Sequence, residues 1–160
     1  MHGVNHQHRE AASAQRTSDR SPSCVGSVLI IDDAPIHGAV IRRVADKVGF
    51  VVTTARSFDA ACELLHQQTF DCITLDLGLG DHVGGDVLTF LSRIGCRAQI
   101  VVISQSDKDT CDDVVQLARA ADLNVYDAVQ KPIDLEALRR TLAEIRALLP
   151  GNAGSHRAEA

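Results

Sequence analysis

The feature that most constrains the fold is a regular alternation of short apolar runs with longer segments of helical periodicity, which begins at Val28. The apolar runs are 28–31, 51–55, 72–77, 99–103 and 125–129. The helical segments lie near 36–48, 58–68, 84–94, 107–121 and 134–148. Five strand–helix units in succession predict an α/β domain whose parallel sheet is covered by helices on both faces.

The composition of the runs predicts the order of the strands. The runs 28–31 and 100–103 are continuously apolar, as expected for central strands that are buried on both faces. The runs 51–54 and 125–128 carry polar residues, as expected at the edges of a sheet. We therefore predict a doubly wound, flavodoxin-like five-stranded parallel sheet with the order 2-1-3-4-5.

Residues that are typical of helix ends support the predicted helix boundaries. Pro35 suits the first turn of the first helix, and Gly49 directly after its last apolar residue predicts the end of that helix. The predicted N-terminal caps of later helices are Ser57, Ser106 or Asp107, and Asp134.

Length and composition limit the class of protein. A chain of 160 residues with 45% apolar residues favours one domain, which we place at 26–149 between a disordered arm (1–25) and a flexible tail (150–160). A net charge of −5 argues against a broad nucleic-acid-binding surface. No segment has the length and apolarity of a membrane span, and the N-terminus lacks the apolar core of a signal peptide, so we expect a cytoplasmic protein.

Polar residues stand where the apolar runs end. Asp32 and Asp33 follow the first run, Asp76 lies near the end of the third, Ser104 closes the fourth and Lys131 follows the fifth. Each alone is compatible with a turn or a helix cap. In the predicted sheet, however, all of these strand ends meet at one edge, at the crevice where ligands bind in doubly wound folds. Their joint placement therefore predicts a functional site.

Three carboxylates beside a lysine indicate phosphoryl chemistry that depends on a divalent cation. Mg²⁺ prefers oxygen ligands, and it relieves the mutual repulsion of clustered carboxylates. A carboxylate that attacks phosphorus forms an aspartyl phosphate, and a cation together with Lys131 would neutralise the phosphoryl oxygens while Ser104 donates a hydrogen bond.

The pattern resembles the receiver domain of two-component response regulators, over residues 28–149. The residues that carry the resemblance are the paired acids Asp32-Asp33, Asp76, Ser104 and Lys131-Pro132. The resemblance implies that Asp76 is the phosphoacceptor and that the Lys131–Pro132 peptide is cis. The implied magnesium ligands are Asp33 directly, Asp32 mainly through water, Asp76 and the Gly78 carbonyl. Ser104 and Lys131 would contact the phosphoryl group.

Two positions depart from the usual receiver pattern. Receivers usually carry an aromatic residue three positions before the lysine, where this chain has Ala128. Tyr126 lies two residues earlier, which predicts the same strand face and a possible substitute. Gly80 occupies a loop position where many receivers have proline.

Neighbouring sequence features do not favour other binding sites. The segment 78–85 fails the dinucleotide-binding pattern, because Val83 occupies the third glycine position, and we expect His82 to be a solvated loop residue. The five cysteines are scattered without a C-x-x-C pair, so the sequence does not predict a zinc site.

The leading functional prediction is a single-domain receiver that accepts phosphate from a sensor histidine kinase or a histidine phosphotransfer protein. Its output would be contact with a downstream protein or onward phosphotransfer, without nucleic-acid or membrane binding, and as a monomer or weak dimer. It would catalyse only its own phosphorylation and dephosphorylation. One alternative is a phosphatase or phosphotransferase that acts on external substrates, although such enzymes commonly need a second acid where this chain has Gly78. Another is a receiver-like adaptor that is never phosphorylated.

Overall fold

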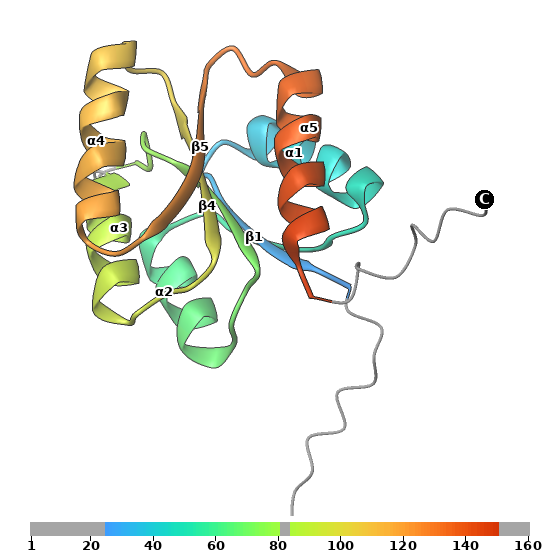
Figure 1. The fold of residues 1–160 in the computed structure, drawn as a ribbon, viewed down its shortest axis with the longest axis horizontal. Coiled ribbons are helices and arrows are strands. Elements are labelled where there is room, and N and C mark those ends of the chain that lie inside the picture. The colour runs from blue at the N-terminus through green and yellow to red at the C-terminus, as the bar shows by residue number, and fades with distance from the viewer. Residues whose placement is uncertain (1–24, 81–83, 151–160) are drawn as a thin grey trace, which may run out of the picture.

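The computed structural model describes residues 25–80 and 84–150, which form a five-stranded parallel sheet flanked by helices (Figure 1). The elements are β1 (Ser27–Ile31), α1 (Pro35–Val48), β2 (Val51–Ala55), α2 (Phe58–Gln67), β3 (Cys72–Asp76), α3 (Gly84–Arg93), β4 (Gln99–Ser104), α4 (Lys108–Ala120), β5 (Asn124–Gln130) and α5 (Leu135–Leu148). The strand order is β2-β1-β3-β4-β5, so the predicted flavodoxin-like topology is confirmed, with β2 and β5 at the edges. The predicted arm and tail lie almost entirely outside the described residues.

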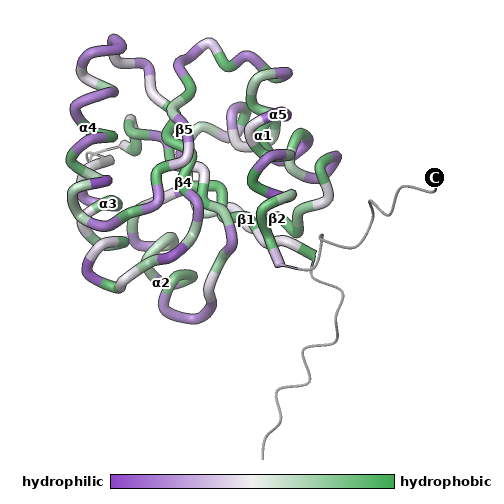
Figure 2. Tube along the Cα trace, viewed as in Figure 1, coloured by the Kyte–Doolittle hydropathy of each residue, from purple (hydrophilic) through white to green (hydrophobic). Residues whose placement is uncertain are grey.

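The sheet separates two apolar layers (Figure 1). Helices α1 and α5 cover one face, where Ile41, Leu138 and Leu142 pack against β1 and β4. Helices α2, α3 and α4 cover the other face. Apolar segments follow the central strands and polar ones the outer surfaces of the helices (Figure 2). None of the helices within the described ranges is long and apolar enough to cross a bilayer.

Local sequence signals account for the helix boundaries. Pro35 opens α1, and Gly49 ends it in the left-handed conformation (φ +96°), which glycine adopts without steric cost. The Ser57 side chain accepts a hydrogen bond from the Ala60 amide at 3.1 Å. Asp107 rather than Ser106 caps α4, because its carboxylate accepts from the Thr110 amide at 2.9 Å. Asp134 caps α5 as predicted.

A bulge in β5 changes the predicted position of Tyr126. The pairing with β4 moves from Ile100–Val125 to Val101–Asp127, so Tyr126 is the extra residue of the bulge. Tyr126 therefore packs on the α5 side of the sheet, whereas Ala128 packs on the α4 side. The prediction that both share one strand face is wrong, because the inserted residue shifts the alternation of side chains by one.

Candidate phosphoryl-acceptor site

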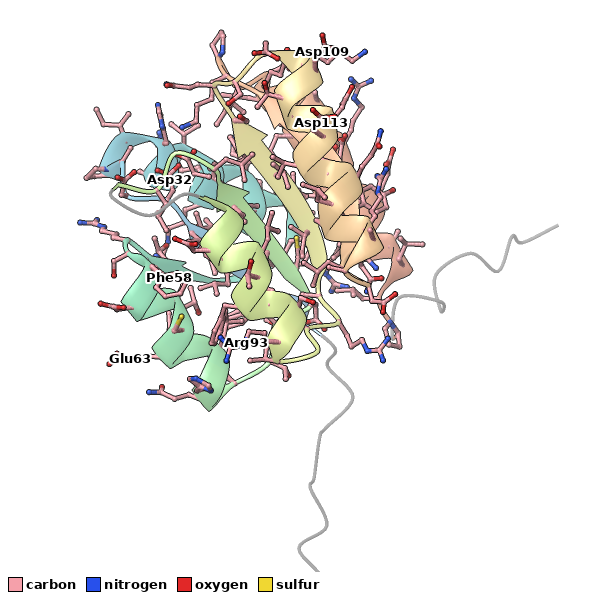
Figure 3. The ribbon with its side chains drawn as sticks, turned by 90° about the vertical axis from the view of Figure 1, so that its left-hand side faces the viewer. Asp32, Phe58, Glu63, Arg93, Asp109 and Asp113 are labelled. Carbon is pink, nitrogen blue, oxygen red and sulfur yellow. The ribbon has the colours of Figure 1, made fainter. Side chains whose placement is uncertain are left out.

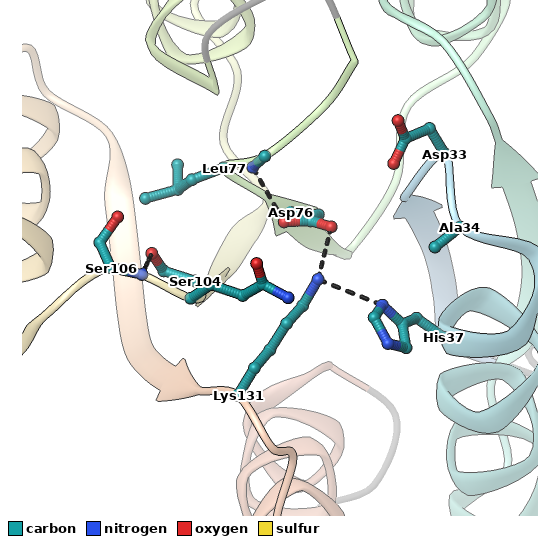
Figure 4. A pocket seen from close by; sticks show the side chains of 10 residues that line it. Asp33, Ala34, His37, Asp76, Leu77, Ser104, Ser106 and Lys131 are labelled. Atoms are coloured by element: carbon teal, nitrogen blue, oxygen red, sulfur yellow. Dashed lines mark hydrogen bonds and ion pairs between the residues drawn. The ribbon is translucent and has the colours of Figure 1, made fainter.

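The carboxyl ends of the strands bring the predicted site residues together. Asp32 follows β1, Asp76 ends β3, Ser104 ends β4 and Lys131 follows β5. A pocket of about 370 Å³ opens at this edge (Figure 4). Its lining residues are Asp33, Ala34, His37, Asp76, Leu77, Gly78, Ser104, Gln105, Ser106 and Lys131. The structure thus places the predicted residues at one edge of the sheet, and Asp33, Asp76, Gly78, Ser104 and Lys131 line the same pocket.

Asp76 is held in a defined orientation by two donors. Its Oδ2 accepts a hydrogen bond from Lys131 Nζ at 2.7 Å, and its Oδ1 accepts one from the Gly78 amide at 2.9 Å. The side chains of Lys131 and Asp76 are only 9% and 5% exposed, so this ion pair is shielded from solvent. The Lys131–Pro132 peptide is cis, as predicted.

Asp32 is a buried carboxylate with an unsatisfied oxygen. The residue is 1% exposed, and its Oδ1 accepts a hydrogen bond from the Ala34 amide at 2.8 Å. Its Oδ2 is buried and has no hydrogen-bond partner among the described residues. Burial raises the pKa of Asp32, and repulsion from Asp76 raises it further against the opposing effect of the Ala34 bond.

The arrangement of acids fits the predicted divalent cation. Asp33 is exposed at the rim of the pocket and Asp76 lines its buried wall, while Asp32 is buried next to Asp33. The unpaired Asp32 oxygen lacks the partner that a buried acceptor normally has, and hard oxygen donors of this kind suit Mg²⁺. The Gly78 carbonyl accepts a hydrogen bond from the Gly80 amide at 3.0 Å. Because a carbonyl oxygen carries two lone pairs, this bond leaves one for a cation.

Gly80 has a conformational reason to replace the proline of many receivers. Its φ is +54°, within the left-handed region. Proline fixes φ near −65°, so it is incompatible with this backbone. The loop after the acceptor therefore follows a path that depends on glycine at position 80. The predicted loop residue His82 lies outside the described residues.

Ser104 connects the end of β4 to the loop before α4. The residue is 1% exposed, and its Oγ accepts a hydrogen bond from the Ser106 amide at 3.0 Å. The Ser104 carbonyl accepts from the Lys131 amide at 2.9 Å. Its hydroxyl is thus close to the pocket and linked to the backbone of the β4–α4 loop (Figure 4).

His37 is a site residue that the sequence analysis missed. Its Nδ1 lies 3.2 Å from Lys131 Nζ (Figure 4). The same Nδ1 lies 4.0 Å from Asp32 Oδ2. The sequence places it in the first turn of the helix after Asp32-Asp33, near the same edge of the sheet. This position among apolar residues of α1 carries no motif that distinguishes it from a surface histidine.

Comparison with known proteins places these features in a family. The profile of the response regulator receiver domain matches residues 28–143. The chain is 34% identical over 127 residues to the alginate biosynthesis transcriptional regulatory protein AlgB of Pseudomonas syringae, covering 77% of this chain and 27% of that protein. It is 33% identical over 115 residues to the nitrate/nitrite response regulator protein NarP of Escherichia coli, covering 70% of this chain and 53% of NarP. The chain thus spans about a quarter to a half of these relatives.

Solved structures agree on the fold. A sensor protein from Polaromonas superposes with a TM-score of 0.66 at 25% identity, covering 78% of this chain and 98% of that chain. The receiver domain of the Francisella response regulator 1452 superposes with a TM-score of 0.66 at 17% identity, covering 75% of this chain and 95% of that chain. Given the family match over most of its length, the chain belongs to the response regulator receiver domain family.

Proposed function

We propose that this chain is a phosphorylation-controlled signalling module that accepts a phosphoryl group on Asp76 in the presence of Mg²⁺. The observation that carries the proposal is the setting of the Asp76 carboxylate. It is buried, it faces an open pocket, and Lys131 contacts it at 2.7 Å. The neighbouring Asp32 oxygen without a partner supports a cation at the same place.

The acceptor reaction follows from the chemistry of these groups. A carboxylate oxygen of Asp76 forms the new O–P bond while the P–N bond of a phosphohistidine donor breaks, and the released imidazole takes a proton from solvent. Mg²⁺, held by Asp32, Asp33, Asp76 and the Gly78 carbonyl, would supply neutralisation of the phosphoryl oxygens. The Lys131 ammonium adds a second positive charge, and Ser104 offers a hydroxyl donor.

The phosphoryl donor and the downstream protein target are part of the same proposal. The phosphoryl donor would be a sensor histidine kinase or a histidine phosphotransfer protein, and the output would be contact with another protein or onward phosphotransfer. The chain would catalyse only its own phosphorylation and dephosphorylation. Helix α4 directly follows the loop that Ser104 joins, and its outer surface carries Asp109 and Asp113 (Figure 3). A change at Ser104 would therefore reach an acidic protein surface.

Intact-mass measurement with a small phosphodonor tests the proposal. The wild-type protein should gain one phosphoryl group when Mg²⁺ is present and lose this gain when the metal is chelated. Asp76→Asn should gain none, whereas Asp113→Asn, which removes an exposed acid of α4, should label like the wild type. Full labelling of Asp76→Asn would contradict the assignment.

The same experiment separates the alternatives. A receiver is labelled once per chain and releases phosphate only from its own acceptor. Repeated hydrolysis of external phosphomonoesters that requires Asp76 would support the phosphatase alternative. Absence of labelling in folded wild-type protein with Mg²⁺ and donor would support the adaptor.

A further inference from the structure

Three ligand atoms of different chemistry converge beside the pocket. Asp32, His37 and Asp76 each offer one ligand atom, a carboxylate oxygen or a ring nitrogen, and these three atoms lie within 4.8 Å of one another. Asp32 and Asp76 belong to the acidic site described above. His37 lies on the first turns of α1 and adds a nitrogen donor to that set of oxygens.

The contact with Lys131 shows that His37 Nδ1 faces the site. An ammonium group has three donors and no acceptor, so Nδ1, at 3.2 Å from Nζ, is the acceptor of this contact. A lone-pair nitrogen that faces a cation is in the form required of a metal ligand.

Asp32 supplies an independent observation that points to a cation. The residue is only 1% exposed, and its Oδ2 has no hydrogen-bond partner in the described part of the chain. This oxygen lies 4.0 Å from His37 Nδ1. Two ligands that are each about 2.1 Å from one ion can be up to about 4.2 Å apart. The 4.0 Å separation of these two atoms is therefore one that a single ion could bridge.

We propose that His37 makes this a site for a first-row divalent transition ion, with Nδ1 of His37, Oδ2 of Asp32 and a carboxylate oxygen of Asp76 as ligands. Imidazole nitrogen suits transition ions, whereas Mg²⁺ takes oxygen ligands almost exclusively. The inference rests on the proposed function, because it concerns the metal that accompanies the same acceptor. It predicts that the ratio of Mn²⁺ affinity to Mg²⁺ affinity is higher with His37 present than with the carboxylates alone.

Lys131 would have to move when an ion binds to this ligand set. Its Nζ contacts both His37 Nδ1 and Asp76 Oδ2. Because Nδ1 has a single lone pair, an ion bound to it would take the place of the ammonium, so binding of a transition ion would exchange one cation for another at His37.

Mn²⁺ provides a direct probe of the nitrogen ligand. The full chain, with His2, His6, His8, His82 and His156 replaced by Gln, would be loaded with Mn²⁺, and pulsed electron paramagnetic resonance would detect ¹⁴N coupled to the ion. We expect an imidazole ¹⁴N signal that is absent in His37→Gln and unchanged in His66→Gln, a histidine of α2 far from the pocket. Gln is a good helix former and His37 is 40% exposed, so the fold should tolerate the change.

Calorimetric titration with Mn²⁺ and with Mg²⁺ gives the second measurement. The ratio of Mn²⁺ to Mg²⁺ affinity should fall about tenfold or more in His37→Gln relative to His66→Gln. An unchanged ratio, or a Mn²⁺ centre without a ¹⁴N signal, would overturn the inference. Since labelling of Asp76 with Mg²⁺ is measured separately, failure here would leave the proposed function standing. If the ¹⁴N signal is present but Asp76 is not labelled, the nitrogen ligand is supported and the proposed function is contradicted.

Discussion

Tyr126 and Ala128 lie two residues apart in β5 yet pack on opposite faces of the sheet. The Tyr126 hydroxyl donates a hydrogen bond to Glu144 of α5 at 2.8 Å, and this bond raises the pKa of the phenol. Ala128 instead packs toward α4, where receivers usually carry an aromatic side chain. Tyr126 is therefore on the wrong side of the sheet to replace that aromatic residue.

Phosphorylation should change amide exchange at 104–112 and leave the β5 bulge nearly unchanged. A phosphoryl group on Asp76 offers acceptors that recruit the Ser104 hydroxyl, which now accepts from the Ser106 amide at 3.0 Å. Movement of Oγ would release that amide and loosen the loop into α4. Hydrogen exchange measured by mass spectrometry, with and without phosphodonor, detects the difference.

The matched control for this response is Tyr126→Phe, which removes only the bond to Glu144. It should retain the response at 104–112, whereas Ser104→Ala should lose it. A response that disappears in Tyr126→Phe would show that the tyrosine takes part in the switch despite its position.

The two neighbouring acids should contribute unequally to Mg²⁺ binding. We expect Asp33→Ala to weaken binding by about tenfold or more and Asp32→Ala to weaken it less, because a direct ligand makes a short ionic contact and one acting through water can be replaced by solvent. Mg²⁺ titration of both variants measures this. Equal losses or the reverse order would contradict this assignment of the two acids.

Asp32→Asn should stabilise the protein at neutral pH when metal is absent, by on the order of 1 kcal/mol, because a buried charge is removed and the Ala34 bond can be kept. The pKa of Asp32 is raised in the folded state. Protonated Asp32 therefore favours the folded state of the wild type. This stabilisation is complete below the unfolded-state pKa and is lost as the pH rises through the folded-state pKa.

Denaturant unfolding at several pH values tests this prediction for Asp32→Asn. Its advantage over the wild type should be full above the raised pKa and should vanish in acid, below the ordinary carboxyl pKa. Saturating Mg²⁺ should stabilise the wild type more than the variant. An advantage that does not depend on pH would contradict the electrostatic explanation.

Lys131 and Asp76 should be strongly coupled in stability. Lys131→Met leaves the buried Asp76 carboxylate without its counter-charge, and we expect a loss of about 2–4 kcal/mol in the free energy of unfolding at neutral pH. In the Asp76→Asn background the same change should cost much less. A double-mutant cycle by denaturant unfolding gives the coupling energy, and simple additivity of the two changes would refute the coupling.

Much of this protein follows from local patterns in its sequence. Short continuous apolar runs such as 28–31, set between helical segments, predict buried strands. Residues such as Pro35, Gly49 and Ser57 mark helix ends through backbone chemistry that needs no distant partner. Parallel strands then bring their carboxyl ends to one edge. The sequence alone therefore predicted the topology and the joint placement of Asp76 and Lys131.

Tertiary structure decided what depends on register and packing. The bulge that separates Tyr126 from Ala128 arises where β5 pairs with β4, and no local signal marks the extra residue. His37 enters the site only because α1 packs against the sheet at an angle that brings Nδ1 to Lys131. The unsatisfied oxygen of Asp32 likewise reflects burial by several elements at once. Such features depend on distances between segments far apart in the chain, which periodicity and spacing do not encode.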